Sequence, residues 1–181
     1  MCRPGHRPGP VAFCRYVRGV VNRRAELRRQ YLSLGTGELA AATLFAAVAA
    51  LGVVPLIDGD RARAALWAAL VPLLAVLVQA GAYWLLARRW VGLGSMPPRL
   101  AALYRVLRVA DVVLLALGLA GVAIWLPATP GAALMVIGVW LFGVVEYLNY
   151  FVVRLSYPIG RWATAVREWR TPRLAQDLRT R

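Results

Sequence analysis

Three acidic side chains, Glu38, Asp111 and Glu146, fall within long apolar stretches of this sequence. A charged side chain at membrane depth costs on the order of 3 kcal/mol, so each one is a candidate functional group. Such carboxylates bind protons or cations, pair with basic side chains, or serve as general acids and bases. Amides, a hydroxyl and arginines occur at similar depths. The candidate polar cluster comprises Glu38, Gln79, Arg105, Arg108, Asp111, Glu146, Asn149 and Tyr150.

Helical spacing predicts which of these groups meet. Arg108 and Asp111 lie three residues apart, so they share one side of a helix. Glu146 lies on the next apolar stretch, which is joined to theirs by the tight, uncharged hairpin 127–130. Short connections place successive elements side by side. We therefore expect Arg108 to pair with Glu146 or with Asp111.

Two interpretations of the cluster remain open, with Glu38 and Gln79 closing a ring around it in both. In the first, the cluster is a dry clamp that fixes the helices in register, at about 1 kcal/mol per contact. In the second, it lines a water-filled vestibule that binds a small polar or charged ligand. We favour the clamp, because paired intramembrane charges without a further chemical element are typical of it.

The elements that position these residues follow from composition. Hydrophobic residues make up 60% of the 181 residues and charged residues only 17%, whereas soluble domains carry about a quarter charged residues. A membrane-spanning helix needs about 20 mostly apolar residues. Four stretches qualify, at about 37–57, 64–87, 103–126 and 131–154. The predicted fold is all-α: a polytopic integral membrane protein whose four transmembrane helices form an antiparallel bundle, residues 37–154, with basic amphipathic flanking helices.

The distribution of arginine along the chain predicts the orientation in the membrane. Arginine is the only basic residue besides one histidine. Eight arginines precede the first stretch and seven lie between Arg154 and Arg181, whereas the first turn has two and the last hairpin none. Basic loops stay on the cytoplasmic side. We expect a multi-pass protein of the cytoplasmic (inner) membrane, with both termini and the central loop inside.

The flanks, 1–36 and 155–181, are the cytoplasmic segments in this topology. After a disordered start of about ten residues, the first is expected to be a basic helix that ends at Gly35 and Gly37. Both flanks fit either helices lying among anionic head groups or helices packed on the bundle's inner rim. The residues predicted at the inner interface are Trp84, Trp90, Trp162, Trp169, Arg88 and Arg89.

Two residues within the spans require a partner group from elsewhere in the protein. Trp140 falls near the middle of its span, so its indole N–H needs a partner there. Pro72 interrupts the second span and leaves one backbone carbonyl without its usual donor. A neighbouring helix or hydroxyl must meet that carbonyl.

Motifs of enzyme chemistry are not found in the sequence, and we predict no catalytic residue, no metal site and no cofactor. The single histidine, His6, and both cysteines, Cys2 and Cys14, precede the first span. The predicted function is therefore non-enzymatic: an accessory or scaffold subunit of a membrane complex. Expected partners are the bilayer with its anionic head groups and another membrane subunit or a second copy, but no nucleic acid.

Two alternatives remain. The first is a small ion- or proton-coupled carrier or channel that uses Asp111 and Glu146. The lesser one is a membrane enzyme acting on a lipid or isoprenoid head group, in which the same carboxylates supply acid–base groups while Arg105 and Arg108 hold a phosphate.

Overall fold

A computed structural model of the chain describes residues 10–91, 96–152 and Leu174, with only the backbone described for 10–21. The described residues form helices and their connections. The elements are α1 (Pro10–Ala47), the π-helical turn η1 (Val48–Val53), the 3₁₀ turn η2 (Val54–Leu56), α2 (Asp60–Ala87), α3 (Pro98–Ile124) and α4 (Pro130–Phe151). Four helical segments are long and apolar enough to cross a membrane, as the sequence predicts.

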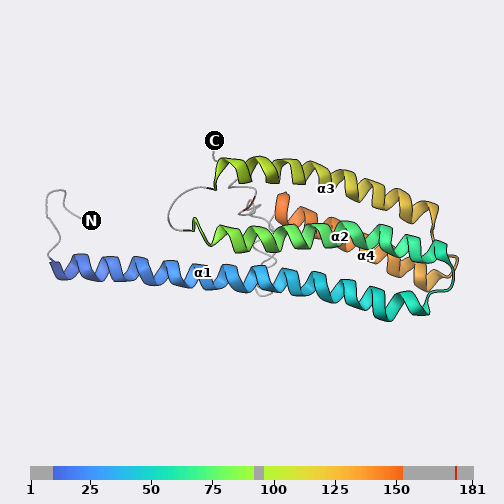
Figure 1. Ribbon diagram of the computed structural model, residues 1–181, viewed down its shortest axis with the longest axis horizontal. Coiled ribbons are helices and arrows are strands. Elements are labelled where there is room, and N and C mark those ends of the chain that lie inside the picture. Colours follow the sequence, from blue (N-terminus) through green and yellow to red (C-terminus); the bar gives the residue numbers. More distant parts are fainter. Residues whose placement is uncertain (1–9, 92–95, 153–173, 175–181) are drawn as a thin grey trace, which may run out of the picture.

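Helix α2 is the centre of the assembly. It packs along α1, α3 and α4, whereas α3 and α4 touch each other less extensively (Figure 1). Its buried side chains alternate small alanines with leucines and Tyr83, which lets three helices approach one axis closely. The other three spans are therefore positioned by contacts with α2.

The outer faces of the other three helices are apolar. Leu44 of α1, Val106 and Leu117 of α3, and Leu134 of α4 each expose more than 60% of their surface. A water-soluble protein seldom exposes a continuous apolar surface of this extent. Lipid tails are a suitable solvent for these side chains.

The expected helix break at Gly35 and Gly37 is wrong, because α1 is one uninterrupted helix from Pro10 to Ala47. Gly35 is buried against α2, where a Cβ atom would lie 2.8 Å from Leu85 Cγ and 3.0 Å from the Gly81 carbonyl oxygen. The glycine therefore permits close packing instead of ending the helix. The basic first half of α1 continues the axis of the span and extends past the end of α2 (Figure 1).

Other boundaries differ by a few residues. Helix α3 begins at Pro98, five residues before the predicted start at 103, since a proline in the first turn needs no N–H partner. Helix α4 ends at Phe151. The expected disordered start and most of the C-terminal flank lie outside the described residues. Leu174 is the exception, and it is buried in the cluster at this end of the bundle.

Pro72 lies inside α2, and its imide nitrogen has no hydrogen for the carbonyl of Ala68. Gly118 of α3 faces that carbonyl: a Cβ atom there would lie 2.6 Å from the Ala68 oxygen and 2.8 Å from Pro72 Cγ. Helix α3 therefore packs closely against the carbonyl that Pro72 leaves without its usual helical donor. Gly121, one turn further on, packs against the Ala68 side chain in the same way.

Candidate functional site

The first polar contact joins α2 to α3. Gln79 Nε2 donates to Asp111 Oδ1 at 2.7 Å, and the Tyr104 hydroxyl donates to the backbone oxygen of Gln79 at 3.0 Å. Asp111 is only 1% exposed. Asp111 Oδ2 and Gln79 Oε1 are buried as well, and neither has a hydrogen-bond donor among the described residues. The pair ties two helices together and leaves two acceptor oxygens available.

The second contact joins α1 to α4. The Tyr150 hydroxyl donates to Glu38 Oε1. Glu146 lies close enough to Glu38 to be affected by its charge, and its carboxylate is hydrogen-bonded to Asn149. The buried indole nitrogen of Trp84 lies near the Tyr150 hydroxyl without making a hydrogen bond of good geometry. Two carboxylates therefore face the same region between α1 and α4.

A third contact joins α4 to α3. The indole N–H of Trp140 donates to the backbone oxygen of Leu115 at 3.0 Å. This confirms that the mid-span tryptophan needs a partner, and the acceptor is a helix carbonyl. Each of the helix pairs α2–α3, α1–α4 and α3–α4 thus contains a polar side chain that reaches the neighbouring helix.

The expected ion pair of Arg108 is not formed. Arg105 and Arg108 are exposed, and the one ion pair among the described residues joins Arg63 to Asp60 at the opposite end of the bundle. Asp111 turns into the core toward Gln79, while the carboxylate that influences Glu146 is Glu38 of α1. The two polar faces that we expected to meet therefore point to different neighbours.

The predicted cluster consequently divides in two. One group, Gln79 and Asp111 with Tyr104, lies between α2 and α3. The other, Glu38, Glu146, Asn149 and Tyr150, lies between α1 and α4. Since the carboxylates and the arginines do not face a common space, this arrangement gives no support to an enzyme that combines them.

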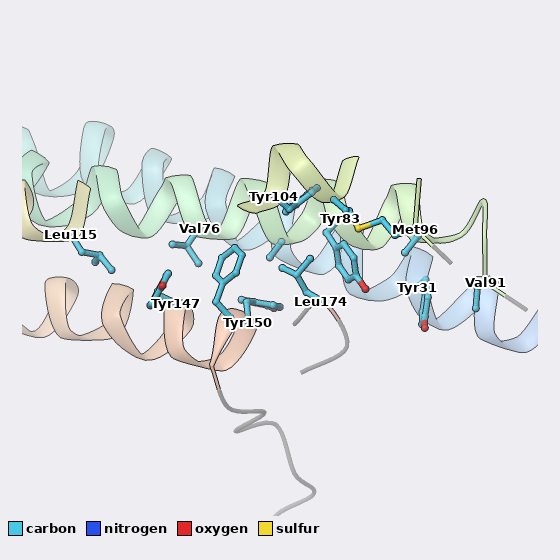
Figure 2. Close-up of a cluster of buried hydrophobic side chains, with 14 residues drawn as sticks. Tyr31, Val76, Tyr83, Val91, Met96, Tyr104, Leu115, Tyr147, Tyr150 and Leu174 are labelled. Carbon is cyan, nitrogen blue, oxygen red and sulfur yellow. The ribbon is translucent and has the colours of Figure 1, made fainter. Parts of the chain in front are cut away.

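The described residues among those predicted at the inner interface lie at the same end of the bundle as Tyr104 and Tyr150. Trp84 packs edge-on between Tyr31 and Tyr83, with ring centroids 5.0 and 5.1 Å away. Trp90 is half-buried on the cluster shown in Figure 2. Arg88 is half-buried with no partner for Nε among the described residues, and Arg89 is exposed. Trp162 and Trp169 lie outside the described residues.

Sequence reasoning missed one long-range contact. Arg24 Nε donates to the backbone oxygen of Val91 at 3.2 Å, which fastens α1 to the connection between α2 and α3. The sequence contains no signal for this bond, because its acceptor is a loop carbonyl that any residue would provide. Leu27 packs on the same cluster, so this part of α1 lies against the end of the bundle at which α2 and α3 are connected.

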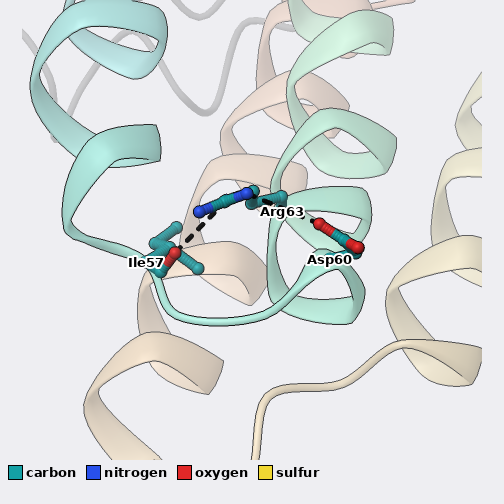
Figure 3. Close-up of polar contacts among 3 residues, drawn as sticks. All are labelled: Ile57, Asp60 and Arg63. Atoms are coloured by element: carbon teal, nitrogen blue, oxygen red, sulfur yellow. Dashed lines mark hydrogen bonds and ion pairs between the residues drawn. The ribbon is translucent and has the colours of Figure 1, made fainter.

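Two hollows among the described residues lie away from the polar groups within the spans. A cleft of about 540 Å³ separates the α1–α2 turn from the α3–α4 turn and includes Asp58, Arg61 and Trp125. Arg63 holds this turn by donating to the Ile57 carbonyl at 3.2 Å and contacting Asp60 at 3.4 Å (Figure 3). A shallow groove of about 330 Å³ between α2 and α3 is lined by apolar residues.

No three His, Cys, Asp or Glu side chains gather into a metal-binding group within 10–91 and 96–152. No family model, curated protein or solved structure matches the chain. The candidate site must therefore be interpreted from its own contacts.

Proposed function

We propose that the chain is a non-enzymatic integral membrane protein that serves as an accessory or scaffold subunit of a membrane complex. The observation that supports this proposal most is that polar residues within the spans form hydrogen bonds between helices. Gln79 with Asp111, Tyr150 with Glu38, and Trp140 with Leu115 each link two helices. Hydrogen bonds of this kind hold membrane helices together, which is the role of a clamp.

In this proposal the four helices form an antiparallel bundle in the cytoplasmic membrane. Both termini, the basic flanks and the central loop lie on the cytoplasmic side, as the distribution of arginines favours. Reporter fusions test the orientation. A fusion after residue 181 should report the cytoplasm, whereas an insertion between Asp58 and Gly59 should report the opposite side.

The membrane-facing side of α1 is the surface that we assign to the partner subunit. It carries small and weakly polar residues, with Thr36, Gly37, Ala40 and Thr43 all exposed. Small residues allow another helix to approach closely in a bilayer. The outer faces of α3 and α4 expose mostly bulky valines and leucines, whereas on α1 the exposed Leu44 lies beside these small residues.

Purification in several mild detergents tests the subunit proposal. We expect a stoichiometric partner or a homo-oligomer. Ala40→Trp should release it because the bulky ring blocks the small-residue face, whereas Val113→Trp on the exposed side of α3 is the matched control and should retain it. A lone monomer in every detergent would contradict the proposal.

A second candidate, an ion- or proton-coupled carrier, is favoured by one observation. Asp111 Oδ2 and Gln79 Oε1 are buried acceptors without a donor among the described residues, and such a site could take up a proton or a small cation. Flux into liposomes tests it. Loss of flux in Asp111→Asn and Glu146→Gln would favour the carrier, and unchanged flux would dismiss it.

A further inference from the structure

Two exposed arginines of α3, Arg105 and Arg108, have no acidic partner among the residues that the structure describes. The nearest carboxylate along the helix, Asp111, is buried and accepts a hydrogen bond from Gln79. Both guanidinium groups are therefore available for a ligand outside the bundle.

The depth of these arginines follows from the length of α3. From Arg108 to Trp125 the helix advances 17 residues, or about 26 Å at 1.5 Å per residue. The hydrocarbon core of a bilayer is about 30 Å thick. With Trp125 at one interface, Arg105 lies about 30 Å away at the other edge of the hydrocarbon core, and Arg108 lies about one turn inside it. Long arginine side chains extend from such positions toward the phosphates. Three exposed valines continue from them into the hydrocarbon, at Val109, Val112 and Val113.

We propose that Arg105 and Arg108 form a binding site for the phosphate group of an anionic phospholipid. They are three residues apart, so their side chains project from the same side of the helix. Arginine binds phosphate through two parallel hydrogen bonds, which a point charge cannot provide. The exposed valines lie where the acyl chains of that lipid would run. The site thus combines a head-group contact with an apolar path, the two features that a phospholipid presents.

This inference depends on α3 crossing the bilayer and holds whether or not a partner subunit exists. Failure of the co-purification experiment would leave it intact. Its own test measures lipid binding to the full-length chain, delipidated in a neutral detergent, by native mass spectrometry. Phosphatidylglycerol is the probe and phosphatidylcholine the neutral comparison.

We expect phosphatidylglycerol to bind more tightly than phosphatidylcholine. Arg105→Gln combined with Arg108→Gln should weaken phosphatidylglycerol binding about ten-fold or more, since each arginine near a membrane surface contributes to anionic binding. Arg61→Gln combined with Arg99→Gln is the matched control, because both residues are exposed, lie outside the basic flanks, and lose the same charge. The control should keep the affinity of the unmodified chain.

Three results would overturn the proposal: equal affinity in both double variants, equal affinity for the two lipids, and displacement of the lipid by excess inorganic phosphate. The last would indicate a site for free phosphate. Retention of the lipid in excess phosphate supports a site that also holds the acyl chains. Equal thermal unfolding temperatures of the two double variants would show that the substitutions act on binding and leave the fold intact.

Discussion

Gly118 of α3 lies directly against the carbonyl oxygen of Ala68 in α2. The carbonyl is the one that Pro72 deprives of its usual helical donor, and a Cβ atom at position 118 would lie only 2.6 Å from it. A proline on one helix and a glycine on the next therefore form a single packing unit. Their match sets how closely α3 approaches the central helix.

Gly118→Ala should destabilise the protein, because backbone atoms cannot move aside for the added methyl group. Overpacking of this kind costs about 1–3 kcal/mol, which exceeds the helix propensity of about 1 kcal/mol that alanine adds. Gly138→Ala on α4 is the matched control, since nothing lies within 4 Å of its Cβ position. Thermal unfolding in detergent should show a lower midpoint for the first variant and an equal or higher one for the second.

Gly35 and Gly81 make a similar contact between α1 and α2, in which each glycine lies close to the other's carbonyl oxygen. Gly35→Leu should separate the two helices and lower the unfolding midpoint, with a loss of about 1–3 kcal/mol. Gly37→Leu, two residues further along the same helix, has open space and should have little effect. A loss of stability in both variants would show that the cause is not the contact with Gly81.

Asp111 provides a test of the clamp. Asp111→Leu should cost about 1 kcal/mol, because the Gln79 amide loses its acceptor. Asp111→Asn should match or exceed the original stability, since the asparagine oxygen still accepts from Gln79 Nε2 and its amide can donate to Gln79 Oε1. Reversible unfolding in mixed micelles measures both. Asp58→Leu in the exposed turn is the control and should be neutral.

Trp140→Phe should weaken the contact between α3 and α4 by about 0.5–1 kcal/mol, because it removes the indole N–H while keeping most of the apolar ring. Trp67→Phe changes the same ring at a position that makes no hydrogen bond in the structure and should change stability less. The same unfolding assay compares them. Equal losses in the two variants would assign the effect to ring size.

The sequence by itself determined that four long apolar segments are present and that Trp140 and Pro72 each require a neighbour. These conclusions depend on the composition of single segments and on groups that must be satisfied in any packing. The tertiary structure decided which polar faces meet. The sequence predicts that Arg108 approaches a carboxylate, yet Asp111 turns to Gln79. The carboxylate that influences Glu146 belongs to α1.

The physical reason is the rotation of each helix about its own axis. Periodicity places residues on a common face, but the direction of that face depends on the close contacts of Gly35, Gly81 and Gly118 with neighbouring helices. The same contacts explain why α1 continues through Gly35. A glycine weakens a helix by only about 1 kcal/mol, and packing against α2 is sufficient to offset that loss.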